Sequence, residues 1–169
     1  MGSGFQTLSC DELTAEAAGL IDRCRTAGVT LATGESCTGG LIAAILTEVP
    51  GASDVVERGF VTYSNQAKSD LLRVPKAVID AHGAVSEPVA RAMAEGVLAA
   101  SPATIAIAVT GIAGPGGGTA GKPVGLVHLA VARRGGRVVH DKQLFGDRSR
   151  REIRLLSVQR AFALIGALL

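Results

Sequence analysis

One short stretch of the chain places two potential nucleophiles beside a turn. In TGESCTGG (residues 33–40), Ser36 and Cys37 are followed by two glycines, where a strand is expected to end and a helix to begin. The first N–H groups of a helix are unpaired and carry partial positive charge, so they would stabilise the oxyanion formed when a serine attacks a carbonyl. The alternative is that Ser36 or Thr38 only caps the helix.

A base for such a serine is available in TYSNQAKSDLL (residues 62–72). Tyr63, the only tyrosine, ends an expected strand, and Lys68 lies in the first turns of the next helix. A lysine removed from water near a helix start has a lowered pKa and can accept a proton. A tyrosine and a lysine five residues apart are weak support on their own. The chain has three histidines, which we expect to be structural or exposed rather than catalytic: His82, His128 and His140.

A glycine-rich segment, TGIAGPGGGTAGKPVG (residues 110–125), follows the most apolar expected strand. Its N–H groups can form a concave site for an anion. It is not a Walker A loop, because Lys122 is not followed by Ser or Thr, and no G-x-G-x-x-G opens a helix here. The alternative is a mobile surface loop without a ligand.

Composition narrows the class of protein. The 169 residues carry a net charge of +2 and three cysteines without C-x-x-C spacing, which disfavours a disulfide framework and a zinc site. No signal peptide or membrane-spanning run is evident, so we expect a soluble cytoplasmic protein. Arginines are concentrated in residues 133–160, where they either face an anion or cover a solvated helix face. They do not suffice to predict nucleic-acid binding.

Hydrophobic spacing and turn residues predict an alternation of helices and strands. Ser9 and Glu12 have the spacing of a capping box, and the helix that follows should end near Gly28. Gly135 and Gly136 mark a late hairpin. The remaining expected elements are strands at 29–33, 55–63, 104–110, 126–134 and 137–145, and helices at 41–49, 65–74, 86–98 and 149–169.

This order predicts an α/β fold, a three-layer sandwich in which a mixed β-sheet has helices on both faces and ends in an antiparallel hairpin. We expect one domain over residues 1–169, with a flexible end at residues 1–8. The segment from Ile153 to Leu169 has apolar residues nearly all round the helix. Self-association as a homo-oligomer would cover the second side, and the alternative is another helix of the same chain.

Four motifs in order give the chain a recognisable resemblance over about residues 10–165. ESCTGG, YSNQAK, TGIAGPGGG…KPVG and a late R-x-x-I-R together resemble the CinA C-terminal domain family, nicotinamide-nucleotide amidohydrolases also called NMN deamidases. The chain is similar to the stand-alone form of this family, which lacks a separate N-terminal domain. The resemblance implies hydrolysis of nicotinamide mononucleotide to nicotinic acid mononucleotide and ammonia, a reaction for which we expect no metal or organic cofactor.

The resemblance also implies roles for particular residues. The nucleophile falls on Ser36, and the base group falls on Tyr63 and Lys68, with Lys68 acting directly or through Tyr63. We expect backbone amides around Thr38, Gly39 and Gly40 to form the oxyanion hole, and Cys37 to be packed away from the reaction. The residues that fall in the family's ligand loop are Thr110, Gly111 and Gly114.

One departure from the family pattern leaves an arginine open. The chain has GDRSRREIR, two residues longer than the family's usual G-D-R-x-x-I-R. The family arginine is Arg148 by the first half of the motif and Arg150 by the second; we favour Arg150, because it preserves the helix register. Two other functions remain as alternatives: a non-catalytic nucleotide-sensing domain that keeps the pocket, and an amidase for a related amide.

Overall fold

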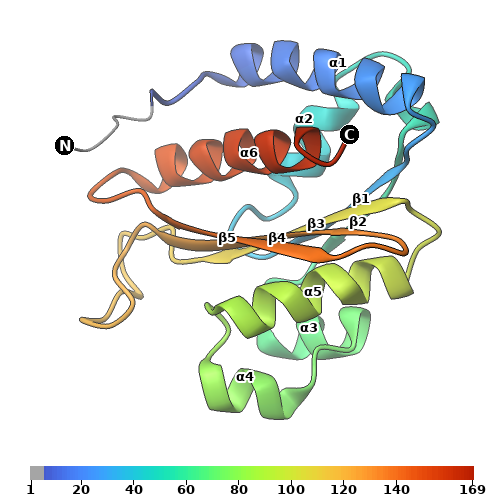
Figure 1. Ribbon diagram of the computed structural model, residues 1–169. Helices are drawn as coiled ribbons and strands as arrows, with labels where there is room; N and C mark the ends of the chain where they lie inside the picture. Colours follow the sequence, from blue (N-terminus) through green and yellow to red (C-terminus); the bar gives the residue numbers. More distant parts are fainter. Residues whose placement is uncertain (1–5) are drawn as a thin grey trace.

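The computed structural model describes residues 6–169, and within them one five-stranded sheet lies between two layers of helices (Figure 1). The sheet order is β2-β1-β3-β4-β5; β2 and β3 run parallel to β1, and β4 and β5 continue antiparallel. The strands are β1 Leu31–Glu35, β2 Val56–Val61, β3 Ile105–Gly111, β4 Leu126–Arg133 and β5 Val138–Leu144. The expected fold, a mixed sheet with helices on both faces and a late hairpin, is confirmed.

Within residues 6–169, six α-helices form the layers above and below this sheet. Above it in Figure 1 lie α1 (Cys10–Thr26), α2 (Leu41–Thr47) and α6 (Arg150–Gly166), and below it lie α3 (Asn65–Leu72), α4 (Lys76–His82) and α5 (Glu87–Ala99). Ser9 and Glu12 form the expected capping box of α1. The helix α4 was not expected from sequence, nor was the 3₁₀ turn Ala52–Asp54.

The two faces of the sheet carry side chains of different size. In β3 and β4, bulky residues such as Ile107 and Leu129 point toward α1 and α6, while alanines such as Ala108 and Ala130 point toward α5. Small residues allow α5 to approach closely: a Cβ added at Gly34 would lie 2.7 Å from a methyl of Val97. Side chains alternate between the two faces of a strand. The size of the residues on each face therefore sets how closely the helices on that face approach the sheet.

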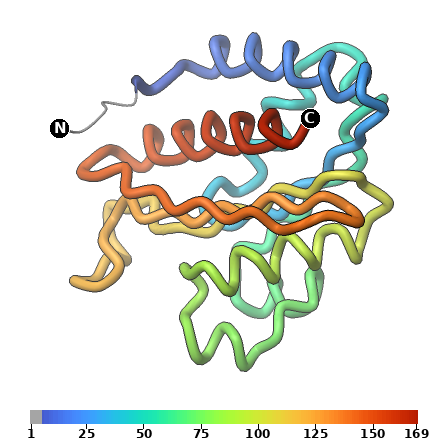
Figure 2. Tube along the Cα trace, viewed as in Figure 1, coloured from blue at the N-terminus to red at the C-terminus, as the bar shows by residue number. Residues whose placement is uncertain are grey.

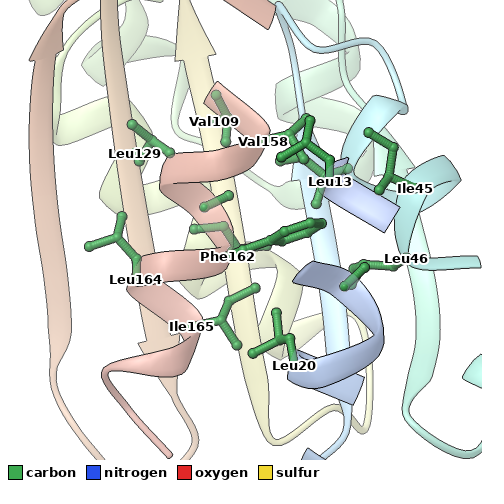
Figure 3. Packing of buried hydrophobic residues seen from close by; sticks show 14 of the residues in the cluster. Leu13, Leu20, Ile45, Leu46, Val109, Leu129, Val158, Phe162, Leu164 and Ile165 are labelled. Carbon is green, nitrogen blue, oxygen red and sulfur yellow. The ribbon is translucent and has the colours of Figure 1, made fainter. Parts of the chain in front are cut away.

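The helix α6 is buried within the chain. Figure 3 shows Phe162 of α6 among the side chains of α1, α2 and the sheet, including Leu13 and Leu46. Its apolar residues therefore meet the sheet on one side and α1 on the other. Of the two ways to cover the second side of this helix, the structure shows another helix of the same chain, α1, in that place. The homo-oligomer stays a prediction.

Two arginines of residues 133–160 hold the ends of helices. Arg134 donates to the carbonyls of Leu98 and Ser101 at the end of α5, and Arg133 donates to the carbonyl of Leu168 just after α6. Terminal carbonyls lack helix partners, so a guanidinium there satisfies them. The arginine cluster is therefore partly structural.

Residues 6–9 lead into α1 without regular structure. The remainder of the expected flexible end, residues 1–5, lies outside the described residues. Across residues 6–169, no helix is both long and apolar enough to cross a membrane.

Candidate active site

The candidate site lies at the carboxyl ends of β1 and β3. The chain leaves β1 through α2 on one face to reach β2, and returns through α5 on the other face to reach β3. The crevice between two parallel strands whose connections leave in opposite directions is the usual ligand site of α/β sheets. Figure 2 shows the glycine-rich segment leaving the sheet at the end where α6 begins.

A serine and a buried lysine meet in this crevice. The Nζ of Lys68 lies 3.0 Å from the Oγ of Ser36 and 2.8 Å from the carbonyl oxygen of Thr62. The side chain of Lys68 is almost fully buried, with 1% of the residue exposed. Burial disfavours the ammonium form and lowers the pKa of Lys68 below its usual value. The pair therefore has the geometry of a nucleophile beside a general base.

The helix that carries Lys68 is fixed in register at its start. Ser64 caps α3 by accepting a hydrogen bond from the N–H of Ala67, and Leu72 of the same helix is buried in the layer beneath the sheet. Lys68 and Leu72 are four residues apart, so they share one face of the helix. Burial of Leu72 thereby directs Lys68 toward the sheet.

The backbone turn after Ser36 is held by a carboxylate. Glu35, fully buried, accepts hydrogen bonds from the N–H groups of Gly40, Ile42 and Ala43, and from the hydroxyl of Thr33. It therefore satisfies donors at the start of α2 that a side-chain cap would otherwise take. Neither Ser36 nor Thr38 caps this helix, because the N-cap residue is Gly40, in the left-handed conformation with φ of 97°.

These contacts overturn part of the expected oxyanion hole. The N–H of Gly40 is taken by Glu35, and the N–H of Gly39 donates to the carbonyl of Ser36. Within residues 6–169, no acceptor group of another residue takes the N–H of Cys37, and Cys37 is among the residues that line the crevice. In other serine hydrolases the residue after the nucleophile supplies an oxyanion donor, and the residue after Ser36 is Cys37.

The thiol of Cys37 is not a competing nucleophile. It is packed in the core above the sheet, and burial raises its pKa to about 12. A thiol with such a pKa is protonated at neutral pH and unreactive. The expectation that Cys37 is packed is confirmed.

Tyr63 and Arg150 meet at the mouth of the crevice. The Nη2 of Arg150 donates to the hydroxyl of Tyr63 at 2.7 Å, and its Nη1 donates to the carbonyl of Gly114 at 2.8 Å. Tyr63 is 60% exposed and is not hydrogen-bonded to Lys68 or Ser36 within the described residues. Lys68 thus contacts Ser36 directly, without Tyr63 between them.

The two candidate arginines have different places. Arg150, the first residue of α6, reaches the crevice, whereas Arg148 donates to the hydroxyl of Thr7 and lies 3.7 Å from a carboxylate oxygen of Glu152. The register argument from the R-x-x-I-R half of the motif therefore identifies the arginine that lies in the site.

The crevice has a volume of about 220 Å³ and brings together six of the ten residues expected in the site. Thr38, Gly39, Gly40 and Gly114 do not line it; Thr38 is fully buried, and the amides of Gly39 and Gly40 are occupied. The lining residues are Ser36, Cys37, Tyr63, Asn65, Lys68, Ala84, Val85, Thr110, Gly111, Ala113 and Arg150.

Sequence reasoning assigned no role to four residues of this site or its supporting turn. Asn65 lies within a quoted motif and faces the crevice, but its role needs the fold to be seen. Glu35 also lies in a motif and was not assigned a role. Ala84 and Val85 follow the unexpected helix α4, and the carbonyl of Ala84 accepts from the hydroxyl of Thr110; nothing in their residue types indicates a site.

The residues present do not form a metal centre of their own. No group of three or more His, Cys, Asp or Glu side chains within residues 6–169 is arranged to hold a metal ion. His128 and His140 contact one another, with 2.9 Å between Nδ1 and Nε2, and do not line the crevice.

Comparisons of this chain with family models and with known proteins point to one family. The family model described as "CinA C-terminal domain" matches residues 13–169. A "CinA-like protein" of Akkermansia muciniphila is 57% identical over 132 residues, which are 78% of this chain and 32% of that protein. Another from Anaeromyxobacter dehalogenans is 53% identical over 131 residues, again 78% and 32%. The chain thus spans about a third of the length of these curated relatives.

Solved structures extend the likeness to the whole fold. Competence/damage inducible protein CihA from Agrobacterium tumefaciens is 49% identical, with a TM-score of 0.92, and the match covers 96% of this chain and 98% of that one. A competence-damaged protein (CinA) superfamily protein from Escherichia coli is 32% identical, with a TM-score of 0.89 over 99% and 96% of the two chains.

Proposed function

This chain belongs to the CinA C-terminal domain family, and on that premise we propose that it is an amidohydrolase that converts nicotinamide mononucleotide and water to nicotinic acid mononucleotide and ammonia. The observation that carries the proposal is the 3.0 Å contact between the Nζ of buried Lys68 and the Oγ of Ser36. A buried lysine with a lowered pKa beside a serine is suited to nucleophilic acyl transfer.

In the first half of the proposed reaction, neutral Lys68 takes the proton of Ser36 as the Oγ attacks the carboxamide carbon. The N–H of Cys37 donates to the oxyanion, where charge develops in the transition state. The tetrahedral intermediate then breaks its C–N bond. The proton held by Lys68 passes to the leaving nitrogen, and ammonia departs from an acyl ester of Ser36.

In the second half, Lys68 is again neutral and takes a proton from a water molecule that attacks the ester. Collapse of this intermediate breaks the bond to Oγ, and the same proton returns to Ser36. The carbonyl of Thr62, 2.8 Å from Nζ, holds the amine toward Ser36 in both halves. Atoms balance as amide plus water giving acid plus ammonia.

The mouth of the crevice supports the choice of a nucleotide. Arg150 can contact a phosphate through its guanidinium edge, since guanidinium groups bind phosphate oxygens in pairs. Tyr63 offers an exposed aromatic face to a pyridinium ring, which is a cation. A crevice of about 220 Å³ holds the reacting amide and ring and leaves the phosphate end near the surface.

Release of ammonia from a panel of amides tests the proposal. The panel contains nicotinamide mononucleotide, nicotinamide riboside, nicotinamide, asparagine and a pyrimidine carboxamide. Turnover of the mononucleotide above the others supports the proposal. Turnover of a different amide would point to a related amidase, and tight binding of the mononucleotide without ammonia would point to a sensing domain.

A further inference from the structure

The R-x-x-I-R motif contains a second arginine whose role is open. Arg154 lies four residues after Arg150 on α6, so the two side chains leave the same face of the helix. Arg150 reaches the mouth of the crevice, whereas Arg154 reaches the back of the turn that follows Ser36.

Arg154 contacts the backbone rather than the crevice. Its Nη2 donates to the carbonyl oxygen of Thr38 at 2.7 Å, and that oxygen also accepts from the N–H of Leu41. Its Nε is buried and, within the described residues, has no hydrogen-bond partner. Burying part of a guanidinium with only one carbonyl as its acceptor costs free energy. Packing alone therefore does not account for this contact.

The contact begins a chain of hydrogen-bonded peptide groups. The carbonyl of Thr38 belongs to the same peptide unit as the N–H of Gly39, which donates to the carbonyl of Ser36 at 3.0 Å. The carbonyl of Ser36 in turn shares its peptide unit with the N–H of Cys37. Hydrogen bonds in series polarise one another, so a cation at one end strengthens the donor at the other.

We propose that Arg154 is a positioning residue that orients and polarises the N–H of Cys37 toward the oxyanion through the peptide units of residues 36–39. This inference rests on the proposed acyl chemistry at Ser36 and adds a residue to it. Arg154 touches neither substrate nor reacting atoms. Glu35 holds the other end of the same turn through the N–H groups of Gly40, Ile42 and Ala43.

The test compares two arginines of one helix. Arg154→Met removes the guanidinium behind the turn, and Arg160→Met removes a guanidinium of α6 that pairs with Asp141 at 2.7 Å, away from the crevice. We expect Arg154→Met to lower kcat for the mononucleotide by about 10²-fold, the size of effect that follows misplacement of a catalytic group, while KM changes less than about threefold. Arg160→Met keeps kcat.

A second readout does not depend on the identity of the substrate. Phenylmethanesulfonyl fluoride reacts with an activated serine: the Oγ–S bond forms, fluoride leaves, and the proton passes to the base. The rate of mass gain at Ser36 should fall with Arg154→Met by a similar factor. Arg154→Lys, which can still donate to Thr38, should recover part of it; Arg154→Lys and Arg154→Gln replace Arg154→Met if that variant does not fold.

The outcomes separate the two proposals. Slower labelling of Ser36 in Arg154→Met supports the inference even if the wild-type enzyme releases no ammonia from the mononucleotide. Unchanged labelling and kcat in Arg154→Met, or equal losses in Arg154→Met and Arg160→Met, would overturn it. A wild-type Ser36 that neither turns over an amide nor reacts with the sulfonyl fluoride would overturn both.

Discussion

Lys68 and Ser36 lie in hydrogen-bond contact although 32 residues separate them and α3 and the turn after β1 hold them in place from different layers. The lysine rises from the layer beneath the sheet, and the serine lies just beyond a central strand. Because each is fixed by its own buried neighbours, the contact exists before substrate arrives. Such preorganisation removes the need to assemble the pair during the reaction.

Ser36→Ala is expected to abolish turnover and leave the fold intact. The substitution removes only the Oγ, while the N–H of Ser36 keeps its bond to the carbonyl of Val109. Loss of a covalent nucleophile costs several powers of ten in kcat. Steady-state ammonia release and circular dichroism check the two parts, with Cys37→Ala as the matched control. Full activity in Ser36→Ala and loss in Cys37→Ala would identify the cysteine as the nucleophile.

Lys68→Met is expected to lower kcat by about 10²- to 10⁴-fold, the range for loss of a general base, with a smaller change in KM. The pH dependence of kcat/KM shows which protonation state of Lys68 is active. Neutral lysine is the active form, so the wild-type rate should rise with pH and level off below 10.5, because burial lowers the pKa of Lys68. A Lys68→Met enzyme with the wild-type rate and pH profile would exclude this lysine as the base.

Lys68→Met should also change stability in a defined direction. Because the folded-state pKa is lowered, the unfolded chain binds the proton more readily, and the free energy of unfolding rises as pH increases toward 10.5. The variant should lose this dependence and be at least as stable as the wild-type protein near neutral pH. Urea unfolding at several pH values measures it.

Tyr63→Phe is expected to act on binding more than on chemistry. The hydroxyl of Tyr63 accepts a hydrogen bond from Arg150. Without it, the guanidinium that we propose binds the phosphate is held in place less firmly. KM for nicotinamide mononucleotide should rise about three- to tenfold, the range for one exposed charge-assisted hydrogen bond. Nicotinamide riboside, which lacks the phosphate, is the control substrate. A large loss of kcat with unchanged KM would instead place Tyr63 in the proton transfer.

Glu35→Gln is expected to lower both stability and kcat. A glutamine side chain has one acceptor oxygen, and its NH₂ would face backbone N–H groups that now donate to the second carboxylate oxygen. A buried donor left unpaired costs about 1–3 kcal/mol in the free energy of unfolding. Exposed Glu48 of the same region supplies the control, Glu48→Gln. Equal unfolding midpoints in the two variants would contradict the role given to Glu35.

The two neighbouring histidines predict a loss of stability in acid. His128 is 8% exposed and contacts His140; burial, helped by the charges of His140 and Lys142, lowers its pKa to about 4. Glu87 of α5, 3.3 Å from His140, opposes this shift. The unfolded chain protonates first as pH falls below 6.5, so the free energy of unfolding decreases between pH 6.5 and 4.

The decrease should reach up to about 3 kcal/mol, since one pKa unit corresponds to about 1.4 kcal/mol. His128→Leu should flatten this part of the curve of unfolding free energy against pH. His82→Gln alters an exposed histidine and should leave the curve as it is. An identical slope in wild type and His128→Leu would show that other groups cause the acid dependence.

The sequence predicted the layers and the pair that we propose reacts, but not the contacts of the turn between them. The roles of Ser36 and Lys68 were implied by the family resemblance, because the residue types alone are weak support. Parallel strands bring the two strand-to-helix junctions to one edge of the sheet. The start of α2 at Leu41 was predicted correctly. What the sequence did not reveal is that the carboxylate of Glu35 takes the amide of Gly40, which had been assigned to the oxyanion hole. Such a bond depends on how the turn folds, which residue types do not fix.

The predicted end of β1 and the absence of α4 from the prediction also have physical reasons. β1 was expected to end at Thr33, since glycine and glutamate are typical of loops, yet it continues to Glu35. This strand position is occupied by glycine, Gly34, because the closely packed Val97 leaves no room for a Cβ. The helix α4 buries only Ile79 among its seven residues, so it has no apolar periodicity to reveal it.

The place of α6 in the chain has a consequence for the timing of activity during protein synthesis. Arg150 and Arg154 lie on this helix, which follows all five strands and every other helix in the order of translation. A nascent chain that has left the ribosome only as far as β5 already contains Ser36 and Lys68, but not the helix that covers the bulky face of the sheet. The proposed amide hydrolysis should therefore begin only after release of α6 from the exit tunnel, and truncated or stalled products should lack it.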